Sequence, residues 1–478
     1  MVSWPRPRIS DVSRRTRAAA VAVLLLLGGC SSEDGDDTEG AAGVGDPYFP
    51  KAGNGGYDVT HYDLTLDYVP GTRQLTGTAV ITARATRQLT SYHLDLTGLD
   101  VEKVTVDGEP ARTSRSGQEL TVRPATGLSE GKVFTTTVRY SGTPRTITDP
   151  DGSEEGWLPT ADGAVALGEP VGSMAWFPGN HHPSDKATYD LRVTVPEGLT
   201  AVSNGELVSE KAAGAGRRTF VWRAGEPMAS YLAMLAVGKF AVRRTAVDGL
   251  PVYTAVDATQ VAASRAVVGR LGDVLDWAAY NFGPYPFRST GVVVGRAGDA
   301  GYALETQNRP FFPGPPELST FVHELAHQWF GDSVTPRTWR DMWLNEGFAT
   351  YAEWLWSEDH DGDTAQEIFD AVYAGDYYDD AEADEAIWAF APGDPPGTDH
   401  ISDPPVYMRG ALVVHRIRQI LGDDAFYDFL QGWTREHRHL VVDTGELKAY
   451  LEKVAPGEDW DGVWDAWVYG KSKPASVS

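Results

Sequence analysis

Cysteine is almost missing from this chain of 478 residues, which contains only one, Cys30. A closed structural zinc site is usually built from several cysteines, so that class of metal site is excluded. Disulfides within the chain are excluded too, because each bridge joins two thiols. Outside the cytoplasm, such a protein would depend for its stability on packed cores and bound metal alone.

Positive charge is also scarce, with 41 lysines and arginines against 67 aspartates and glutamates and a net charge of −26. Removal of the leader described below, which holds five arginines and one aspartate, would lower the net charge to −30. A surface this acidic repels nucleic-acid phosphates and anionic lipid headgroups. We therefore expect no nucleic-acid partner, and we expect attraction of cationic amino termini.

Near the start, the apolar run 18–27 is too short to span a membrane comfortably. Five arginines precede it, and this order predicts a signal peptide over residues 1–29. Its end, Leu27-Gly28-Gly29-Cys30, resembles a bacterial lipobox, in which the cysteine becomes the lipid-modified first residue of the mature protein. The sequence thus predicts an exported lipoprotein, anchored in the cell membrane through Cys30 and facing outside the cytoplasm.

Residues 30–50 are rich in Gly, Asp and Glu, and this composition predicts a flexible acidic linker between the lipid and the folded part of the chain. Beyond it, apolar and polar residues alternate with a period of two, as in half-buried strands. The alternating stretches include residues 62–68, 92–96, 134–140 and 189–195. We predict an all-β domain over residues 51–247.

The pattern lengthens to helical periods beyond Asp248-Gly249. Helices are expected over residues 260–280, 318–330, 340–356 and 411–421, with a small sheet around residues 291–295. The second domain is therefore predicted to be mainly helical, over residues 248–470, followed by a tail of residues 471–478. The fold class is multidomain, with a β domain first and a helical domain second.

The most informative motif is His323-Glu324-Leu325-Ala326-His327, inside one of the expected helices. Residues four apart share one helix face, so His323 and His327 can direct their imidazoles at the same metal ion. Glu324 lies beside them without ligating, where it can serve as a general base. The pattern predicts a zinc-dependent hydrolytic site.

A third ligand is available in Asn345-Glu346-Gly347, which begins 18 residues after His327 and lies in a second expected helix. Two histidines and Glu346 fill three positions of tetrahedral zinc and leave the fourth open for water. An open position is typical of catalytic zinc, so we predict one catalytic Zn²⁺ per chain.

These motifs, with an Ala303-Leu304-Glu305 segment before them and Tyr407-Met408-Arg409-Gly410 after them, resemble the M1 family of zinc aminopeptidases, or gluzincins. The family's exopeptidase motif is Gly-x-Met-Glu-Asn, of which only the glutamate, Glu305, is kept here. The resemblance extends over roughly residues 50 to 470. It implies an aminopeptidase that acts on peptides with a free N-terminus.

The resemblance also implies roles for four further residues. Glu305 corresponds to the glutamate that binds the substrate's α-amino group, and Tyr407 to the tyrosine that stabilises the tetrahedral intermediate. Glu169 stands where the family usually has a glutamine near the substrate amine, so it either adds charge to that subsite or is a loop residue. Glu353 corresponds to a position that hydrogen-bonds a ligand histidine, although an exposed helix glutamate is the alternative.

In family terms, the two domains resemble the saddle-like β domain and the thermolysin-like catalytic domain. We expect a short form without the family's large C-terminal helical domain, which leaves the cleft more open or closed by another subunit. Two other functions remain at this stage: a thermolysin-like endopeptidase, which would have no use for Glu305, and a non-catalytic peptide-binding lipoprotein. Bifunctional epoxide hydrolysis is disfavoured, because its carboxylate-binding contribution comes from the missing region.

Overall fold

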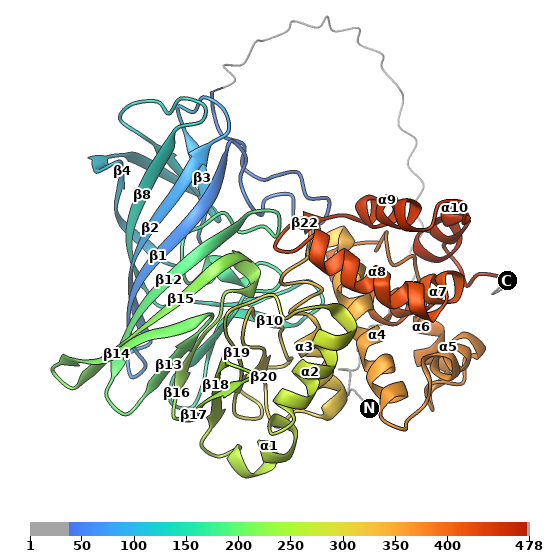
Figure 1. The fold of residues 1–478 in the computed structure, drawn as a ribbon. Coiled ribbons are helices and arrows are strands. Elements are labelled where there is room, and N and C mark those ends of the chain that lie inside the picture. The colour runs from blue at the N-terminus through green and yellow to red at the C-terminus, as the bar shows by residue number, and fades with distance from the viewer. Residues whose placement is uncertain (1–37, 476–478) are drawn as a thin grey trace, which may run out of the picture. The chain divides into compact units, whose positions relative to one another are not determined.

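The computed structural model describes residues 38–475. The predicted signal peptide, residues 1–29, and Cys30 lie outside the described residues. Strands of the first half of the chain, blue to green in Figure 1, lie together, and most helices follow in yellow to red. The predicted order of a β domain and then a mainly helical domain is confirmed.

The β domain follows the alternation of the sequence. In β1 the side chains of Tyr62, Leu64, Leu66 and Tyr68 are buried, while the residues between them are not. The strands are β1 (Tyr57–Val69), β2 (Gln74–Ala85), β3 (Tyr92–Asp95), β4 (Asp100–Val106), β5 (Glu109–Pro110), β6 (Arg112–Ser116), β7 (Glu119–Arg123), β8 (Val133–Gly142), β9 (Thr146–Thr148), β10 (Glu154–Pro159), β11 (Ala164–Leu167), β12 (Lys186–Pro196), β13 (Thr200–Ser203), β14 (Glu206–Gly214), β15 (Arg217–Ala229) and β16 (Leu235–Gly238).

These strands form three sheets. The largest has the order β14-β15-β12-β1-β2-β8-β4-β5, the second has the order β13-β16-β11-β10-β9, and the third has the order β3-β7-β6. Within the large sheet β1 and β12 run parallel, with Tyr62 opposite Tyr189. Their rings stack at 4.8 Å between centroids, which fixes the register by aromatic packing in the core.

The second half of the chain contains the helices and a four-stranded sheet. The helices are α1 (Val261–Val268), α2 (Leu271–Phe282), α3 (Leu318–Ala326), α4 (Trp343–Asp359), α5 (Ala365–Ala374), α6 (Ala381–Ala386), α7 (Gly410–Leu421), α8 (Asp423–Glu436), α9 (Thr444–Val454) and α10 (Trp460–Val463). The sheet has the order β17 (Phe240–Val247), β18 (Leu250–Asp257), β19 (Thr290–Val294) and β20 (Phe311–Phe312), and β21 (Thr335–Pro336) pairs with β22 (Val441–Val442). Single turns of 3₁₀ or π helix span Gly172–Ala175, Ser230–Leu232, Trp339–Asp341, Thr398–His400, Pro405–Arg409 and Trp464–Val468.

Two boundaries differ from the prediction. The predicted domain limit at residue 247 cuts through the β17–β18 hairpin, and both of its strands belong to the sheet of the helical half. β17 is mostly exposed and shows no regular alternation, so the sequence pattern gave no sign of which strands it pairs with. The helix expected over residues 260–280 is two helices, because the chain breaks at Gly269 and Arg270.

The last part of the predicted flexible linker is folded against both halves. The carboxylate of Asp46 accepts hydrogen bonds from Tyr48 and Phe49 main-chain N–H groups at 2.8 Å and from Trp339 N–H at 3.1 Å. It also lies 3.2 Å from Nε2 of His182. The composition of this segment predicted a solvated acidic stretch. The Asp46 carboxylate is instead buried, and its four donors offset the cost of removing it from water. The segment 38–50 is thus part of the folded unit.

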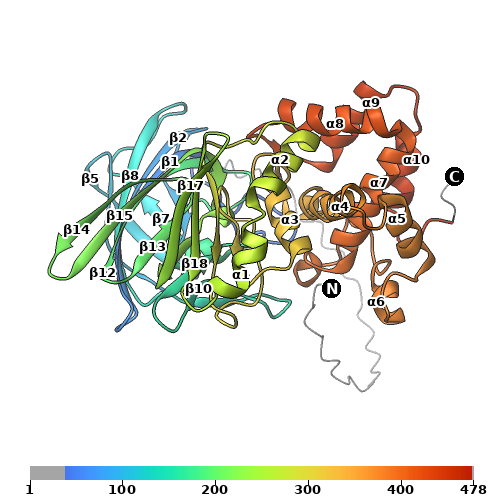
Figure 2. The same cartoon turned by 60° about the horizontal axis from the view of Figure 1, so that its bottom comes forward.

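One lysine of the β domain holds the turn that follows α3. Lys186 Nζ donates to the main-chain oxygens of Asp332 and Ser333 at 2.9 and 3.0 Å, and to Thr335 Oγ1 at 2.7 Å. Helix α4 packs against α3 on one side and α7 on the other (Figure 2). The arrangement presents residues of α3 and α4 to one another.

Candidate metal centre

The two histidines of the central motif come together at the end of α3. His323 is in the helix, and His327, with φ of −56°, continues the helical backbone one residue past it. Their ring centroids are 4.6 Å apart, and both side chains are buried. Buried apolar residues on the same helix, among them Phe321, Val322 and Leu325, fix this face of α3 against the core.

Glu346 of α4 completes the cluster. Its Oε2 lies 3.2 Å from His323 Nε2 and 3.4 Å from His327 Nε2. Ligand atoms of a tetrahedral zinc ion, bound at about 2.0–2.1 Å, are separated by about 3.3 Å, so these three groups fit zinc. This set is also one of the clusters of the described residues whose ligand atoms all lie within 4.8 Å of one another.

The other ring nitrogens are held by acceptors, which sets the tautomers. His323 Nδ1 lies 2.9 Å from Glu353 Oε1, so Glu353 contacts a cluster histidine and is not a free surface residue. His327 Nδ1 lies 3.0 Å from Phe330 O and 2.5 Å from Asn345 Oδ1. With Nδ1–H donating to these oxygens, each Nε2 keeps its lone pair for a metal.

The electrostatics of the cluster favour a cation. Burial raises the pKa of Glu346, but the two histidines outweigh it and hold the pKa at about 2. Burial lowers the pKa of His327, but Glu346 and Glu305 raise it to about 9. Burial also lowers the pKa of His323, but Glu346 and Glu353 outweigh burial and raise that pKa well above 6.5. The carboxylates therefore hold positive charge at this point, as a zinc ligand set does.

Glu324 lies next to the cluster, and its Oε2 is buried without a hydrogen-bond partner among the described residues. Oxygen of Glu324 and ligand atoms of His327 and Glu305 lie within 4.8 Å of one another. Burial raises the pKa of Glu324 to about 8 against the opposing effect of the histidines. A buried carboxylate with an unused oxygen beside a metal site has the chemistry of a proton acceptor.

Glu305 and Glu169 lie on the same side of the cluster. Carboxylate oxygens of Glu169, Glu305 and Glu346 are all within 4.8 Å of one another. Glu305 Oε1 accepts a hydrogen bond from Asn345 Nδ2 at 2.9 Å. Burial raises the pKa of both Glu305 and Glu169. Glu169 is thus a loop residue, after β11, that lies close to Glu305 and Glu346.

Asn345 is a residue whose role the sequence did not reveal. Its side chain joins the ligand His327, through Oδ1, to Glu305, through Nδ2. Gln328 supports the same region, since its Nε2 donates to Glu305 O at 3.1 Å and its Oε1 accepts from Asn308 N–H at 2.8 Å. The signal was available for Asn345, because it stands directly before the third ligand in Asn345-Glu346-Gly347.

Two glycines, Gly347 and Gly410, allow the backbones of α4 and α7 to approach closely, and this contact places Tyr407 beside the cluster. A Cβ on Gly347 would lie 2.7 Å from the carbonyl carbon of Gly410, closer than any side chain permits, so α4 and the start of α7 contact through glycine. Tyr407 lies in the π turn Pro405–Arg409 just before that point. Its ring stacks on His323 at 6.1 Å between centroids.

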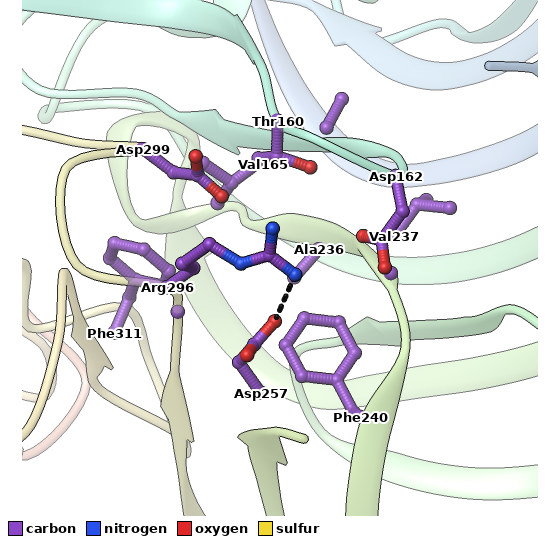
Figure 3. A pocket seen from close by; sticks show the side chains of 13 residues that line it. Thr160, Asp162, Val165, Ala236, Val237, Phe240, Asp257, Arg296, Asp299 and Phe311 are labelled. Atoms are coloured by element: carbon purple, nitrogen blue, oxygen red, sulfur yellow. Dashed lines mark ion pairs between the residues drawn. The ribbon is translucent and has the colours of Figure 1, made fainter. Parts of the chain in front are cut away.

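A small cavity elsewhere does not compete with this site. It is lined by residues of β11 and β16 and by the segment that follows β19, and Arg296 and Asp257 face each other across it at 3.6 Å (Figure 3). Its volume of about 20 Å³ has room for about one water molecule. None of its lining residues belongs to the His323, His327 and Glu346 cluster.

Two family models match the chain in succession. The Peptidase M1 N-terminal domain matches residues 59–232, and the Peptidase family M1 domain matches residues 317–467. The first match lies in the β domain, and the second contains the cluster, Glu353 and Tyr407.

Curated relatives carry aminopeptidase names. "Aminopeptidase M1-D" of Oryza sativa subsp. japonica is 28% identical over 343 residues, which are 66% of this chain and 38% of that protein. "Aminopeptidase 2" of Candida albicans is 23% identical over 441 residues, 85% of this chain and 46% of that protein. The chain thus spans less than half the length of these relatives.

Solved structures match over nearly the whole chain. A mutant M1 zinc metallopeptidase from Deinococcus radiodurans, bound to a Tyr-Ser-Ala substrate, is 32% identical with a TM-score of 0.83, covering 90% of this chain and 98% of that one. A mutant described as a two-domain M1 zinc metallopeptidase, bound to L-arginine, gives the same values.

Proposed function

Because the chain belongs to peptidase family M1, we propose that it is a zinc-dependent aminopeptidase that removes the N-terminal residue of peptides. The observation that carries this proposal is the position of Glu305 and Glu169 beside the ligand set. An endopeptidase needs zinc ligands and a base, but a pair of carboxylates on one side of the cluster suits a free ammonium group. Such a pair would fix the substrate's end so that the first peptide bond meets the zinc.

His323, His327 and Glu346 would hold the zinc. The ion supplies Lewis-acid chemistry, polarising the scissile carbonyl and lowering the pKa of water. Glu324 would accept the proton of the attacking water with its unused buried oxygen, and later give it to the leaving amine. Tyr407, whose ring stacks on His323, would donate a hydrogen bond from its phenol O–H to the carbonyl oxygen, which becomes negative as the carbonyl is attacked.

Removal of the metal tests this proposal without relying on activity alone. Elemental analysis of the purified protein should give one zinc per chain, and Glu346→Ala should lose most of it because one of three ligands is missing. Treatment with a chelator should abolish hydrolysis of aminoacyl coumarin amides, and added zinc should restore it. Full zinc content in Glu346→Ala, or hydrolysis that persists without metal, would refute the proposal.

We also propose that the chain is exported and held at the cell membrane by lipid on Cys30. The arginine-rich leader and Leu27-Gly28-Gly29-Cys30 support this. Among residues 38–475, no helix is long and apolar enough to cross a membrane. Cys30→Ser should therefore move the protein from the membrane fraction to the soluble fraction. A processed variant that stays with the membrane would contradict the lipid anchor.

A further inference from the structure

The loop that carries Glu169 is held by its main chain. Glu169 Oε1 is buried and has no hydrogen-bond partner among the described residues, so this oxygen does not fix the side chain. Its position depends on the backbone from Gly168 to Gly172, which follows β11. The groups that hold this backbone therefore determine how Glu169 faces Glu305.

Glu155, on β10, is the principal support of that backbone. Its Oε1 and Oε2 each lie 3.1 Å from the main-chain nitrogen of Val171, and its Oε2 lies 2.6 Å from that of Gly172. Both nitrogens donate, so one carboxyl group binds two successive N–H groups. The Glu155 side chain is completely buried.

Asp149, in the turn between β9 and β10, is the partner of Glu155. Burial raises the pKa of Asp149 to about 6, and burial together with the neighbouring Asp149 carboxyl group raises the pKa of Glu155 well above 4.5. Two buried carboxyl groups that repel one another in this way are not both ionised at neutral pH, so one of them keeps a proton. Because the pKa of Glu155 is the more strongly raised, the proton lies on Glu155, whose Oε2 still accepts from the N–H groups of Val171 and Gly172.

Close packing leaves the loop little freedom. A Cβ on Gly168 would lie 2.4 Å from Tyr231 O, and a Cβ on Gly172 would lie 2.4 Å from Leu167 O. On the other side, Tyr302 OH lies 3.4 Å from Glu169 O. Tyr302 is three residues before Glu305, so the same contacts connect both carboxylates of the proposed amine subsite.

We propose that Glu155, through its bonds to the main chain of Val171 and Gly172, is a positioning residue that sets Glu169 against Glu305 and so determines affinity for the substrate's ammonium group. This inference rests on the proposed function. Glu155 does not touch the substrate, and its effect passes through the main chain of Val171 and Gly172 to Glu169. Loss of the support should weaken ammonium binding in both ground state and transition state, which raises KM and leaves kcat nearly unchanged.

Two substitutions of Glu155 distinguish the effect of its side-chain length from the effect of its carboxyl group. Glu155→Gln keeps a carbonyl for the two N–H groups and gives an NH₂ that donates to Asp149, so KM should stay within about twofold of wild type. Glu155→Asp keeps the carboxyl group but withdraws it by about 1.5 Å, one carbon–carbon bond, so KM for L-alanyl and L-arginyl coumarin amides should rise about tenfold. Glu154→Gln is the matched control, because Glu154 is the exposed neighbour on the same strand and should change nothing.

A double-mutant cycle decides whether Glu155 acts through Glu169. Glu169→Gln alone should raise KM, and Glu155→Asp should add almost nothing in that background. If Glu155→Asp does not fold, Asp149→Ala, which removes the carboxyl group that acts on Glu155, takes its place and should raise KM in the same direction. Equal KM increases in both backgrounds, or an unchanged KM in the folded variants, would overturn the inference and leave the zinc aminopeptidase intact. An unchanged KM in Glu169→Gln would overturn both the inference and the proposed amine subsite.

Discussion

Glu324 is the residue whose removal should separate metal binding from chemistry. Glu324→Gln leaves His323, His327 and Glu346 in place but cannot accept a proton, so turnover should fall at least about a hundredfold. Elemental analysis should still find one zinc per chain. Near-normal turnover at full zinc occupancy would show that another group is the base.

Tyr407 should contribute only once negative charge has formed on the former carbonyl oxygen. Tyr407→Phe removes one hydroxyl and keeps the ring on His323, so kcat should fall about a hundredfold, in line with about 3 kcal/mol for one positioned donor. Steady-state kinetics should give a nearly unchanged KM. A tenfold higher KM at normal kcat would make Tyr407 a binding residue.

How far a residue's role could be predicted depended on whether its partners are near in sequence. His323, Glu324 and His327 are set by helical spacing, and Glu346 by a motif 18 residues on. Glu155 and Asp46 carried no such signal. Their acceptor oxygens meet main-chain N–H groups brought to them by folding, 16 residues away at Val171 and 293 residues away at Trp339.

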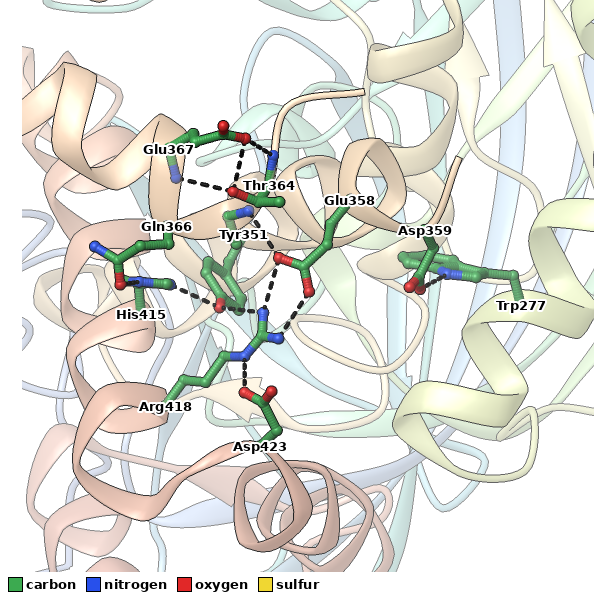
Figure 4. A network of polar contacts seen from close by, with 11 residues as sticks. Trp277, Tyr351, Glu358, Asp359, Thr364, Gln366, Glu367, His415, Arg418 and Asp423 are labelled. Carbon is green, nitrogen blue, oxygen red and sulfur yellow. Dashed lines mark hydrogen bonds and ion pairs between the residues drawn. The ribbon is translucent and has the colours of Figure 1, made fainter. Parts of the chain in front are cut away.

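At the scale of elements, the end of α4 opposite the metal centre is tied to α7 by Arg418. Its guanidinium donates to Glu358 at 2.7 Å and to Asp423 at 2.8 Å, and it lies 3.4 Å from the hydroxyl of Tyr351, which contacts His415 (Figure 4). Because α4 also carries Glu346 and Glu353, this network holds the helix that supplies the third ligand.

Arg418→Met should therefore lower the free energy of unfolding by about 2 kcal/mol, the range of hydrogen bonds to charged groups. Urea unfolding measures the change. The control is Arg416→Met, since Arg416 bonds only Gln419 among the described side chains, at 2.8 Å, and should cost clearly less. Equal losses in the two variants would mean that the network does not stabilise α4.

Asp185 stabilises the start of β12 and should make stability depend on pH. Its carboxyl group accepts from Val59 N–H at 3.2 Å, at a bulge where β1 shifts register against β2. Burial raises its pKa to about 8 from 3.8. Between these values the folded state binds the extra proton, so this contribution is full below pH 3.8 and is lost as the pH rises through about 8.

Asp185→Asn should therefore flatten the fall in stability between about pH 5 and pH 8, by at most about 1.4 kcal/mol for each pH unit. Urea unfolding at several pH values gives the slope. Asp190→Asn is the control, because Asp190 lies on β12, the strand that follows Asp185, but pairs with Arg223 at the surface, at 2.8 Å. An identical slope in wild type and Asp185→Asn would contradict the assignment.

Elements were predictable where the hydrophobic period was regular. The alternation of residues 62–68 gave β1, and the helical period of residues 411–421 gave α7, which begins at Gly410. The period does not report how strands pair, so β17 was assigned to the wrong half of the chain. Nor does it register the break at Gly269, where α1 ends and a new helix starts two residues later.

At the scale of the whole molecule, the metal centre depends on contacts between the two halves of the chain. Lys186 and Asp46 bind main-chain groups next to α3 and α4, while the loop with Glu169 comes from the β domain. These contacts join residues distant in sequence, and composition alone placed Asp46 in a flexible linker. Both halves are therefore needed for a site that binds an amino terminus beside zinc.

Comparing free and N-acetylated peptides in wild type and Glu305→Gln tests the central claim most directly. Gln keeps an oxygen for Asn345 Nδ2, so zinc content should be unchanged while the charge that pairs with ammonium is lost. Wild type should cleave free peptides and leave acetylated ones nearly uncut, and Glu305→Gln should lose at least about a hundredfold in kcat/KM on the free ones. Internal cleavage of acetylated peptides by wild type, with Glu305→Gln equal to wild type on free peptides, would contradict an aminopeptidase.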